Sequence, residues 1–145
     1  MTRTNLAATD DVGFLLSKAS ARLNEVLVER FAAAGFPEVR PSYGSVLVPL
    51  FDRDGLRIGE LAAAARLSKQ AMTGLVASCE RDGLIERERD PADGRAFIVR
   101  LSPRGRRFRG TATDVLADLD AQLRQRLGSR DRDALVRALK GVLEL

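Results

Sequence analysis

One continuous segment, from Arg57 to Leu101, constrains the fold most, because its pattern predicts a helix, a tight turn, a second helix and a two-stranded ribbon. The first helix spans residues 58–64 and turns its apolar residues inward at helical spacing. Residues 65–67 connect it to Ser68, whose hydroxyl can cap the second helix or face a phosphate group. The segment therefore predicts a helix-turn-helix followed by a hairpin.

The second helix is polar where it begins and apolar behind. Leu75, Val76 and Cys79 share one apolar face, whereas the first turns carry the run Ser68-Lys69-Gln70-Ala71-Met72-Thr73. Gly83 ends the helix, because glycine readily adopts the left-handed conformation found at helix C-termini. Polar side chains at the entry and an apolar face behind are what insertion into the major groove of DNA requires.

The ribbon is predicted from two β-prone segments, residues 84–89 and 95–101, joined by the loop Asp90-Pro91-Ala92-Asp93-Gly94. Both faces of the second segment are largely apolar, so we expect it to pack partly on the helices and to leave only its tip free. Arginine favours contacts with phosphates and guanine edges, and it is crowded in and after the ribbon. The arginines concerned are Arg87, Arg89, Arg95, Arg100, Arg104, Arg106, Arg107 and Arg109.

Helices are predicted on both sides of this module. Apolar stripes indicate one helix over residues 11–34 and two helices beyond residue 102. The residues after Ser42 also have helical spacing, although Pro49 lies inside that pattern and can kink a helix. The remaining boundaries are predicted by residues that cap or break helices: Gly35, Ser102 with Pro103, and Gly128 with Ser129.

The composition of the chain excludes several classes of function. The chain has 145 residues, 45% of them apolar, which suits one compact unit with a single core. Histidine is absent and Cys79 is the only cysteine, which removes intrachain disulfides, histidine–cysteine metal sites and histidine general bases. We therefore expect no enzyme activity, no cofactor and no metal. No apolar run approaches the roughly 18 residues of a membrane span, and residues 1–11 lack a signal-peptide core, so we expect a cytoplasmic protein without membrane contact.

The helices at the two ends of the chain carry apolar stripes that the small central module cannot cover completely. A second copy of the chain would bury these stripes by packing on them. An intramolecular helical bundle would bury them as well, so the pattern alone leaves both arrangements open.

These motifs resemble the multiple antibiotic resistance regulator (MarR) family of bacterial winged-helix transcription factors over nearly the whole chain. The resemblance is carried by residues 58–62, 68–73, 75–76, 83–85, 90–96 and 99–105. It implies a mainly α fold with a small β-hairpin wing, in which residues 1–145 form a single domain. The winged helix-turn-helix core would span residues 42–101, and the dimerisation helices residues 11–35 and 102–145.

The resemblance also implies a function. A homodimer would bind a pseudo-palindromic operator in double-stranded DNA, act as a repressor, and be released by a small aromatic or phenolic molecule. The second helix of the helix-turn-helix would enter the major groove, and the wing would reach the minor groove. The implied contacts are Ser68, Lys69, Gln70 and Thr73 in the major groove and Arg95 with Arg89 in the wing.

The chemistry of these side chains agrees with the implied roles. Gln70 can form two hydrogen bonds with adenine, and Lys69 suits a phosphate or a guanine. Arg95 follows a glycine at the hairpin tip, and a narrow minor groove attracts a guanidinium group. The resemblance further implies that Asp93 orients Arg95 through an ion pair.

Three features keep alternatives open. Gly74 stands where many relatives place a basic residue, so a phosphate contact is missing or the helix approaches DNA or another helix closely.

Cys79 is interpreted as a core residue rather than a redox sensor, because it lies on the apolar face and peroxide-sensing relatives carry their cysteine near the start of the first helix. Four residues either line a ligand cleft or only pack a helix junction: Phe14, Arg22, Tyr43 and Phe51.

The alternative function is a winged-helix protein that acts through protein contacts, as an antirepressor does. The presence of Lys69, Gln70, Thr73 and Arg95 together at groove-reading positions argues against it. Salt separates the two functions, because DNA binding weakens by about 0.9 log units per released phosphate counterion for each tenfold rise in salt. A packed protein interface would change far less.

Overall fold

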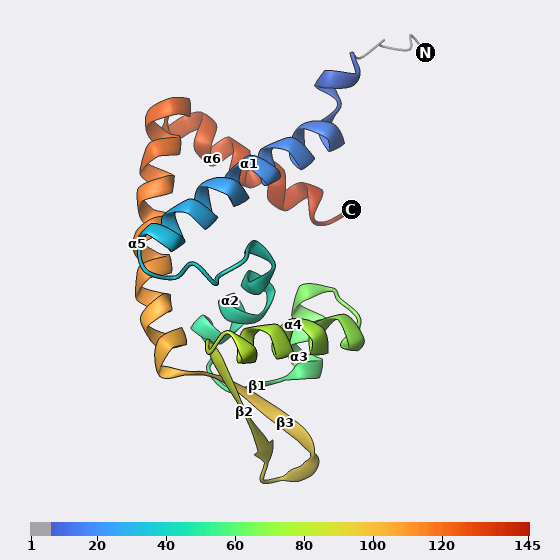
Figure 1. Ribbon diagram of the computed structural model, residues 1–145. Coiled ribbons are helices and arrows are strands. Elements are labelled where there is room, and N and C mark those ends of the chain that lie inside the picture. Colours follow the sequence, from blue (N-terminus) through green and yellow to red (C-terminus); the bar gives the residue numbers. More distant parts are fainter. Residues whose placement is uncertain (1–6) are drawn as a thin grey trace. The chain divides into compact units, whose positions relative to one another are not determined.

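The computed structural model describes residues 7–145 and is mostly helical with one small antiparallel sheet, which confirms the predicted fold class (Figure 1). Contacts divide the chain into two compact units, one ending at Arg109 and the other spanning Gly110–Leu145, and helix α5 runs through both. The elements are η1 (Ala8–Asp10), α1 (Val12–Ala33), η2 (Pro41–Tyr43), α2 (Gly44–Asp52), β1 (Leu56–Arg57), α3 (Ile58–Ala65), α4 (Lys69–Arg81), β2 (Ile85–Asp90), β3 (Asp93–Leu101), α5 (Pro103–Leu127) and α6 (Ser129–Val142).

Local capping residues place the helix ends close to where the sequence predicts them. The backbone N–H of Phe14 donates to the Asp11 carboxylate at 3.0 Å, which caps α1. The same helix ends before Gly35, whose φ of +98° is a conformation that glycine adopts without strain. Helix α2 continues through Pro49 to Asp52, so the proline does not end it.

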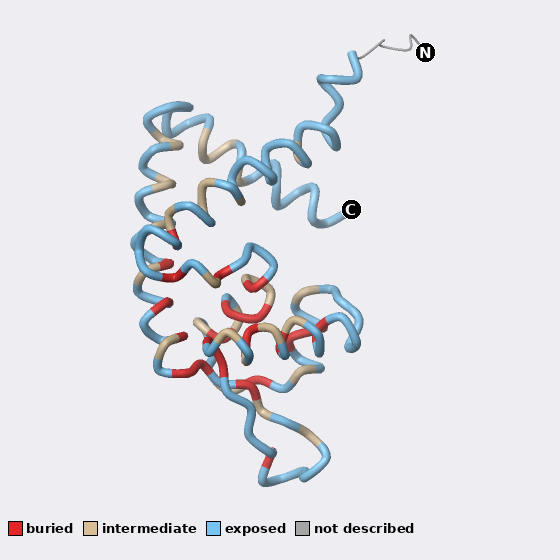
Figure 2. The backbone as a smooth tube through the Cα atoms, in the orientation of Figure 1, coloured by how far each residue is buried: buried red, intermediate tan, exposed pale blue. Residues whose placement is uncertain are grey.

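The core of the first unit lies among α2, α3, α4 and the base of the sheet, where the buried segments in Figure 2 gather. Val76 and Cys79 of α4 are fully buried, as their shared apolar face predicts, whereas Leu75 remains partly exposed. Burial of a large apolar side chain stabilises a fold by about 1.5–3 kcal/mol. The largest fully buried side chains are Tyr43, Leu47, Leu50, Leu61, Met72, Leu84 and Ile85.

The sheet has three strands in the order β1-β3-β2, so the predicted two-stranded ribbon gains a third strand. Strand β1 is two residues long, too short for an alternating pattern to reveal it, and it pairs Leu56 with Val99. The hairpin strands also run further than predicted, because Asp90 pairs with Asp93 after a register shift at the end of β2. The base of β3 is buried and its distal part is exposed, as the sequence predicts.

The second unit consists of the C-terminal part of α5 and helix α6, joined at Gly128, whose φ is +81°. Asp120 of α5 pairs with Arg132 of α6 at 2.6 Å, and Arg124 of α5 pairs with Asp133 of α6 at 3.3 Å. Within residues 7–145, no helix is long and apolar enough to cross a membrane. Large apolar side chains in this unit remain exposed: Leu116, Leu127, Leu135, Leu139, Val142, Leu143 and Leu145.

A single residue, Ser102, separates β3 from α5 and is held from three sides. Its hydroxyl donates to the carbonyl of Gly83 at 2.6 Å, and its backbone N–H donates to the carbonyl of Leu84 at 3.1 Å. The hydroxyl oxygen also accepts from the N–H of Gly105 at 3.0 Å, which confirms the predicted N-cap. The start of α5 is therefore fixed to the loop that follows α4.

The end of α1 is fastened to the start of α5 by aromatic and charged contacts. The Phe108 ring lies 4.9 Å from that of Phe31 and 5.1 Å from that of Phe36. The guanidinium of Arg104 stacks 4.4 Å from the Phe36 ring and donates to the Glu38 carboxylate at 2.6 Å. This hydrogen bond lowers the pKa of Glu38, because it stabilises the charged carboxylate.

We predict that Gly105→Ala destabilises the protein. An added Cβ would lie 2.1 Å from the Leu84 carbonyl oxygen, which is backbone and is already bonded to Ser102. Overpacking of this kind costs about 1–3 kcal/mol, and urea unfolding measures it. Gly110→Ala is the control, because it lies in the same helix with open space around its Cβ and should be neutral or stabilising. Equal stability of the two variants would contradict the close approach.

We predict a pH-dependent stability difference between the wild type and Glu38→Gln. The folded-state pKa of Glu38 is depressed, so its contribution is present above the unfolded pKa near 4.5 and is lost as pH falls through the folded pKa. At pH 7 the wild type should be more stable by about 1 kcal/mol. Unfolding free energies measured from pH 7 to pH 3 should converge; a constant difference would mean that the carboxylate charge is not involved.

Candidate nucleic-acid interface

The turn between α3 and α4 leaves the beginning of α4 exposed. Arg66 ends α3 in the left-handed conformation, with φ of +54°, and the N–H of Leu67 donates to the Ala62 carbonyl at 3.0 Å. Ser68 then caps α4, because its hydroxyl oxygen accepts from the N–H of Ala71 at 3.1 Å. The capping role of Ser68 is therefore confirmed, and its hydroxyl is already engaged in the protein.

The polar side chains predicted to enter the major groove lie on the exposed side of α4. Lys69, Gln70 and Thr73 are all exposed, while Met72 between them is fully buried. The Thr73 hydroxyl donates to the carbonyl of Lys69 at 2.8 Å, so its proton is used within the helix. Its oxygen lone pairs and its methyl group are what it can offer a base.

Gly74 follows these residues, and its surroundings decide one open question. A Cβ added there would meet no atom of the described residues within 4 Å. Glycine is therefore not required for the close approach of a helix within residues 7–145. The missing phosphate contact and a close approach of DNA both remain compatible with this position.

The wing is stiffened by arginine side chains stacked on Phe97. Arg87 and Arg89 of β2 place their guanidinium carbons 5.5 and 5.4 Å from the centre of that ring. Arg87 also pairs with Glu80 of α4 at 3.0 Å, and Arg89 donates to the Gly94 carbonyl at 2.7 Å. Arg89, predicted as a DNA contact, thus holds the hairpin tip in this structure.

The contact between Asp93 and Arg95 differs from the expected ion pair. The Asp93 carboxylate accepts from the backbone N–H of Arg95 at 3.1 Å, and no ion pair joins the two side chains in the described part of the chain. A carboxylate two residues before an N–H readily closes such a local turn, which fixes the backbone and leaves the guanidinium exposed. Asp93 therefore shapes the loop from which Arg95 projects.

An ion pair that sequence reasoning missed ties the wing to the helices. Arg57, immediately before α3, donates to the carboxylate of Asp90 at the end of β2. Asp90 is buried and also accepts from the N–H of Ala92 at 2.9 Å, and these bonds lower its pKa, the Ala92 bond most. The partners are 33 residues apart in sequence, so no local sequence pattern predicts the pair.

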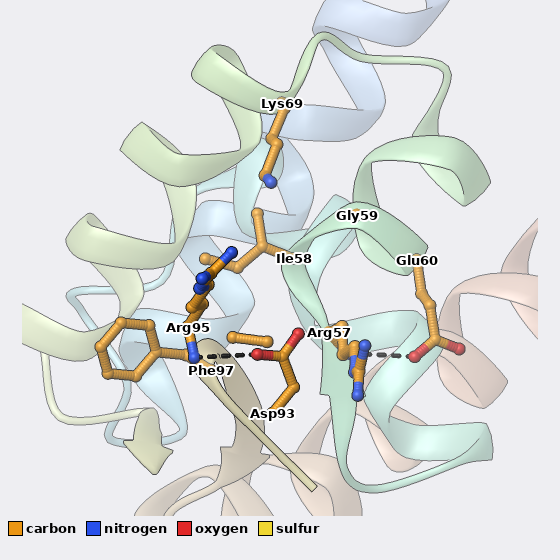
Figure 3. Close-up of a pocket in the computed structure, with 9 residues that line it drawn as sticks. Arg57, Ile58, Gly59, Glu60, Lys69, Asp93, Arg95 and Phe97 are labelled. Carbon is orange, nitrogen blue, oxygen red and sulfur yellow. Dashed lines mark hydrogen bonds between the residues drawn. The ribbon is translucent and has the colours of Figure 1, made fainter. Parts of the chain in front are cut away.

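A cleft of about 540 Å³ separates the beginnings of α3 and α4 from the wing (Figure 3). Glu60 on its edge accepts from the N–H of Arg57 at 3.2 Å and from Arg53 at 2.7 Å. The cleft brings together two predicted DNA contacts, Lys69 and Arg95, whereas Gln70 and Thr73 lie outside its lining. The lining residues are Arg57, Ile58, Gly59, Glu60, Lys69, Asp93, Arg95, Ala96 and Phe97.

Of the four residues considered for a ligand cleft, Tyr43 and Phe51 make contacts within the core. Tyr43 is buried, and its hydroxyl donates to the Asp82 carboxylate at the end of α4 at 2.5 Å. Phe51 lies 6.2 Å from Phe108 in the aromatic cluster, which agrees with packing at a helix junction. Phe14 is exposed, and Arg22 forms an exposed pair with Glu25 on α1.

Comparison with known proteins decides the family. A model of the MarR family matches residues 46–96, which run from α2 into the wing. An uncharacterised HTH-type transcriptional regulator of Mycobacterium leprae is 31% identical over 101 residues, which cover 70% of this chain and 71% of that protein. The chain belongs to the MarR family.

Solved structures of this family share its fold. The transcriptional repressor CouR, bound to a 23-mer DNA duplex, matches with a TM-score of 0.80 and 26% identity over 93% of this chain and 94% of its own. BpsR of Bordetella bronchiseptica, whose DNA binding is regulated by 6-hydroxynicotinic acid, matches with a TM-score of 0.79 and 20% identity over 97% of this chain and 98% of its own. At that identity, the second likeness concerns the fold alone.

We predict that Cys79 of this MarR-family protein is unreactive in the folded state. Burial and, to a smaller extent, the charge of the nearby Asp82 together raise the pKa of its thiol to about 12. Since the thiolate is the reactive form, iodoacetamide at pH 8 should label the native protein far more slowly than the urea-unfolded protein. Mass spectrometry measures the labelling, and rapid labelling of the native protein would contradict the core interpretation.

Proposed function

We propose that the chain is a cytoplasmic, homodimeric repressor that binds a pseudo-palindromic operator in double-stranded DNA and is released by a small aromatic or phenolic molecule. One observation carries the proposal. The polar beginning of α4 and the guanidinium of Arg95 are exposed on the same compact unit, on the two sides of one cleft. A helix in the major groove with a wing in the adjacent minor groove needs such an arrangement.

The proposed base contacts follow from the chemistry of each side chain. Gln70 forms two hydrogen bonds with adenine, and Thr73 offers its methyl group to thymine. Lys69 contacts a phosphate or a guanine, and Arg95 enters the minor groove. Ser68 and Arg89 keep a supporting role here, because the first caps α4 and the second holds the wing tip.

Exposed apolar residues on the terminal helices support the homodimer. Leu15 of α1, Leu116 of α5 and Leu135 of α6 are between 43% and 48% exposed, although their helices carry apolar stripes. A second copy of the chain would bury them. Two recognition helices then need a spacing near one DNA turn, about 34 Å, to reach successive major grooves.

Release by a small molecule follows from the same geometry. A ligand that favours another spacing between the two recognition helices would weaken DNA binding without touching the DNA. The proposed aromatic or phenolic class of ligand is the one that the resemblance to the MarR family implies, and BpsR, which shares the fold, is itself regulated by 6-hydroxynicotinic acid. Repression by this chain has its support in CouR, a repressor with a similar fold.

Fluorescence anisotropy on duplexes from the region upstream of the protein's own gene, with scrambled duplexes as controls, tests the proposal across a salt series. We expect one dimer to bind a site there at least about a hundredfold more tightly than the scrambled sequence. Equal, weak and salt-insensitive binding to both duplexes would favour the protein-contact function instead.

We further predict that Arg95→Ala weakens operator binding and lowers the salt slope by about one phosphate equivalent, near 0.9. Arg81→Ala is the matched control, because it removes an equally charged, exposed side chain from the last turn of α4, far along that helix from the proposed base contacts. The control should bind with the wild-type slope. An unchanged slope for Arg95→Ala would remove the wing from the interface.

A further inference from the structure

We propose that the cleft between α4 and the wing holds a single DNA backbone phosphate, which Lys69 and Arg95 share. This inference rests on the proposed function. It names the DNA group that would contact both the recognition helix and the wing. Figure 3 shows the Lys69 ammonium and the Arg95 guanidinium entering the cleft from α4 and from β3, with Ile58 between them. Both groups are positive, and they come from elements that are far apart in sequence.

Neither cation has a carboxylate partner among residues 7–145, although carboxylates lie nearby. The Glu60 carboxylate is bound by Arg53 and by the N–H of Arg57, and Arg57 itself is paired with Asp90. Asp93 also lines the cleft, but its carboxylate is bonded to the wing backbone and lies on the side of Arg95 opposite to Lys69. The gap between the two cations is therefore left for an anion from outside.

Two like charges that face one gap repel each other, and an anion between them turns that repulsion into attraction. A phosphate suits the gap, because it has several acceptor oxygens. One can take a hydrogen bond from the ammonium and others from an edge of the guanidinium. The guanidinium has five N–H donors, so binding a phosphate leaves donors for the minor groove.

The position of the cleft identifies which phosphate this is. One wall is formed by Arg57 and the start of α3, together with Lys69 of the helix proposed to enter the major groove. The other wall belongs to the wing proposed to enter the minor groove. The two grooves of a duplex are separated by a sugar–phosphate strand, so one strand must pass between these walls. Ile58, Ala96 and Phe97 give the cleft an apolar lining against which a deoxyribose can pack.

A methylphosphonate scan of the bound duplex tests the shared phosphate. Each duplex carries one uncharged methylphosphonate at one backbone position, and its affinity is measured with the wild type, Lys69→Gln and Arg95→Gln. At one position we expect the replacement to weaken the wild type about tenfold and to leave both variants nearly unaffected. Positions of sensitivity that differ for the two variants would overturn the inference.

The double variant gives a second readout. If one phosphate is shared, Lys69→Gln and Arg95→Gln together should weaken binding by about thirtyfold at most, although each alone costs about tenfold. The salt slope should fall by about 0.9 rather than by about 1.8. Additive losses with a fall near 1.8 would mean two separate phosphates and would overturn the shared site.

The controls separate failure of this inference from failure of the proposed function. Arg81→Gln, outside the cleft, should keep the wild-type sensitivity at every position, and thermal unfolding should show that all variants are folded. Saturable wild-type binding without a shared position refutes the phosphate site alone. Absence of specific binding by the wild type refutes the proposed function, and the phosphate site with it.

Discussion

The ion pair between Arg57 and Asp90 joins the two parts of the winged module. A two-stranded hairpin is marginally stable by itself, and the distal part of this one has little apolar burial. Asp90 is buried, and a buried carboxylate is tolerated only when its oxygens are bonded. Here one oxygen is bound by Arg57 and the other by the Ala92 N–H, so the same carboxylate shapes the loop and fastens it to the helices.

This ion pair holds the wing and the helices of the candidate interface in fixed positions relative to each other. Arg57 stands directly before α3, and α3 leads through a tight turn to α4, whose first residues are exposed. The Arg87–Glu80 pair is a second link between the wing and the helices, and it joins the wing to α4. The groups proposed to contact DNA are therefore carried by elements that are tied to one another, which favours a preorganised site over one that orders on binding.

The elements that sequence could predict are those whose causes are local. Asp11, Ser68 and Ser102 cap helices through bonds to residues three positions away, and the pattern of exposed residues at the start of α4 follows from helical spacing. Strand β1 and the Arg57–Asp90 pair depend on partners that only the fold brings together. The contact between Asp93 and Arg95 is local, but the expected ion pair came from the family resemblance, and the structure has a bond from the Arg95 backbone N–H to the Asp93 carboxylate instead.

The single-residue connection between β3 and α5 at Ser102 restricts insertions at this point of the chain. An extra residue there would turn everything after it by about 100° around the helix axis. Phe108 would then leave its neighbours Phe31 and Phe36, and Gly105 would no longer meet the Leu84 carbonyl. Homologous chains should therefore keep the spacing between the wing and the long helix constant.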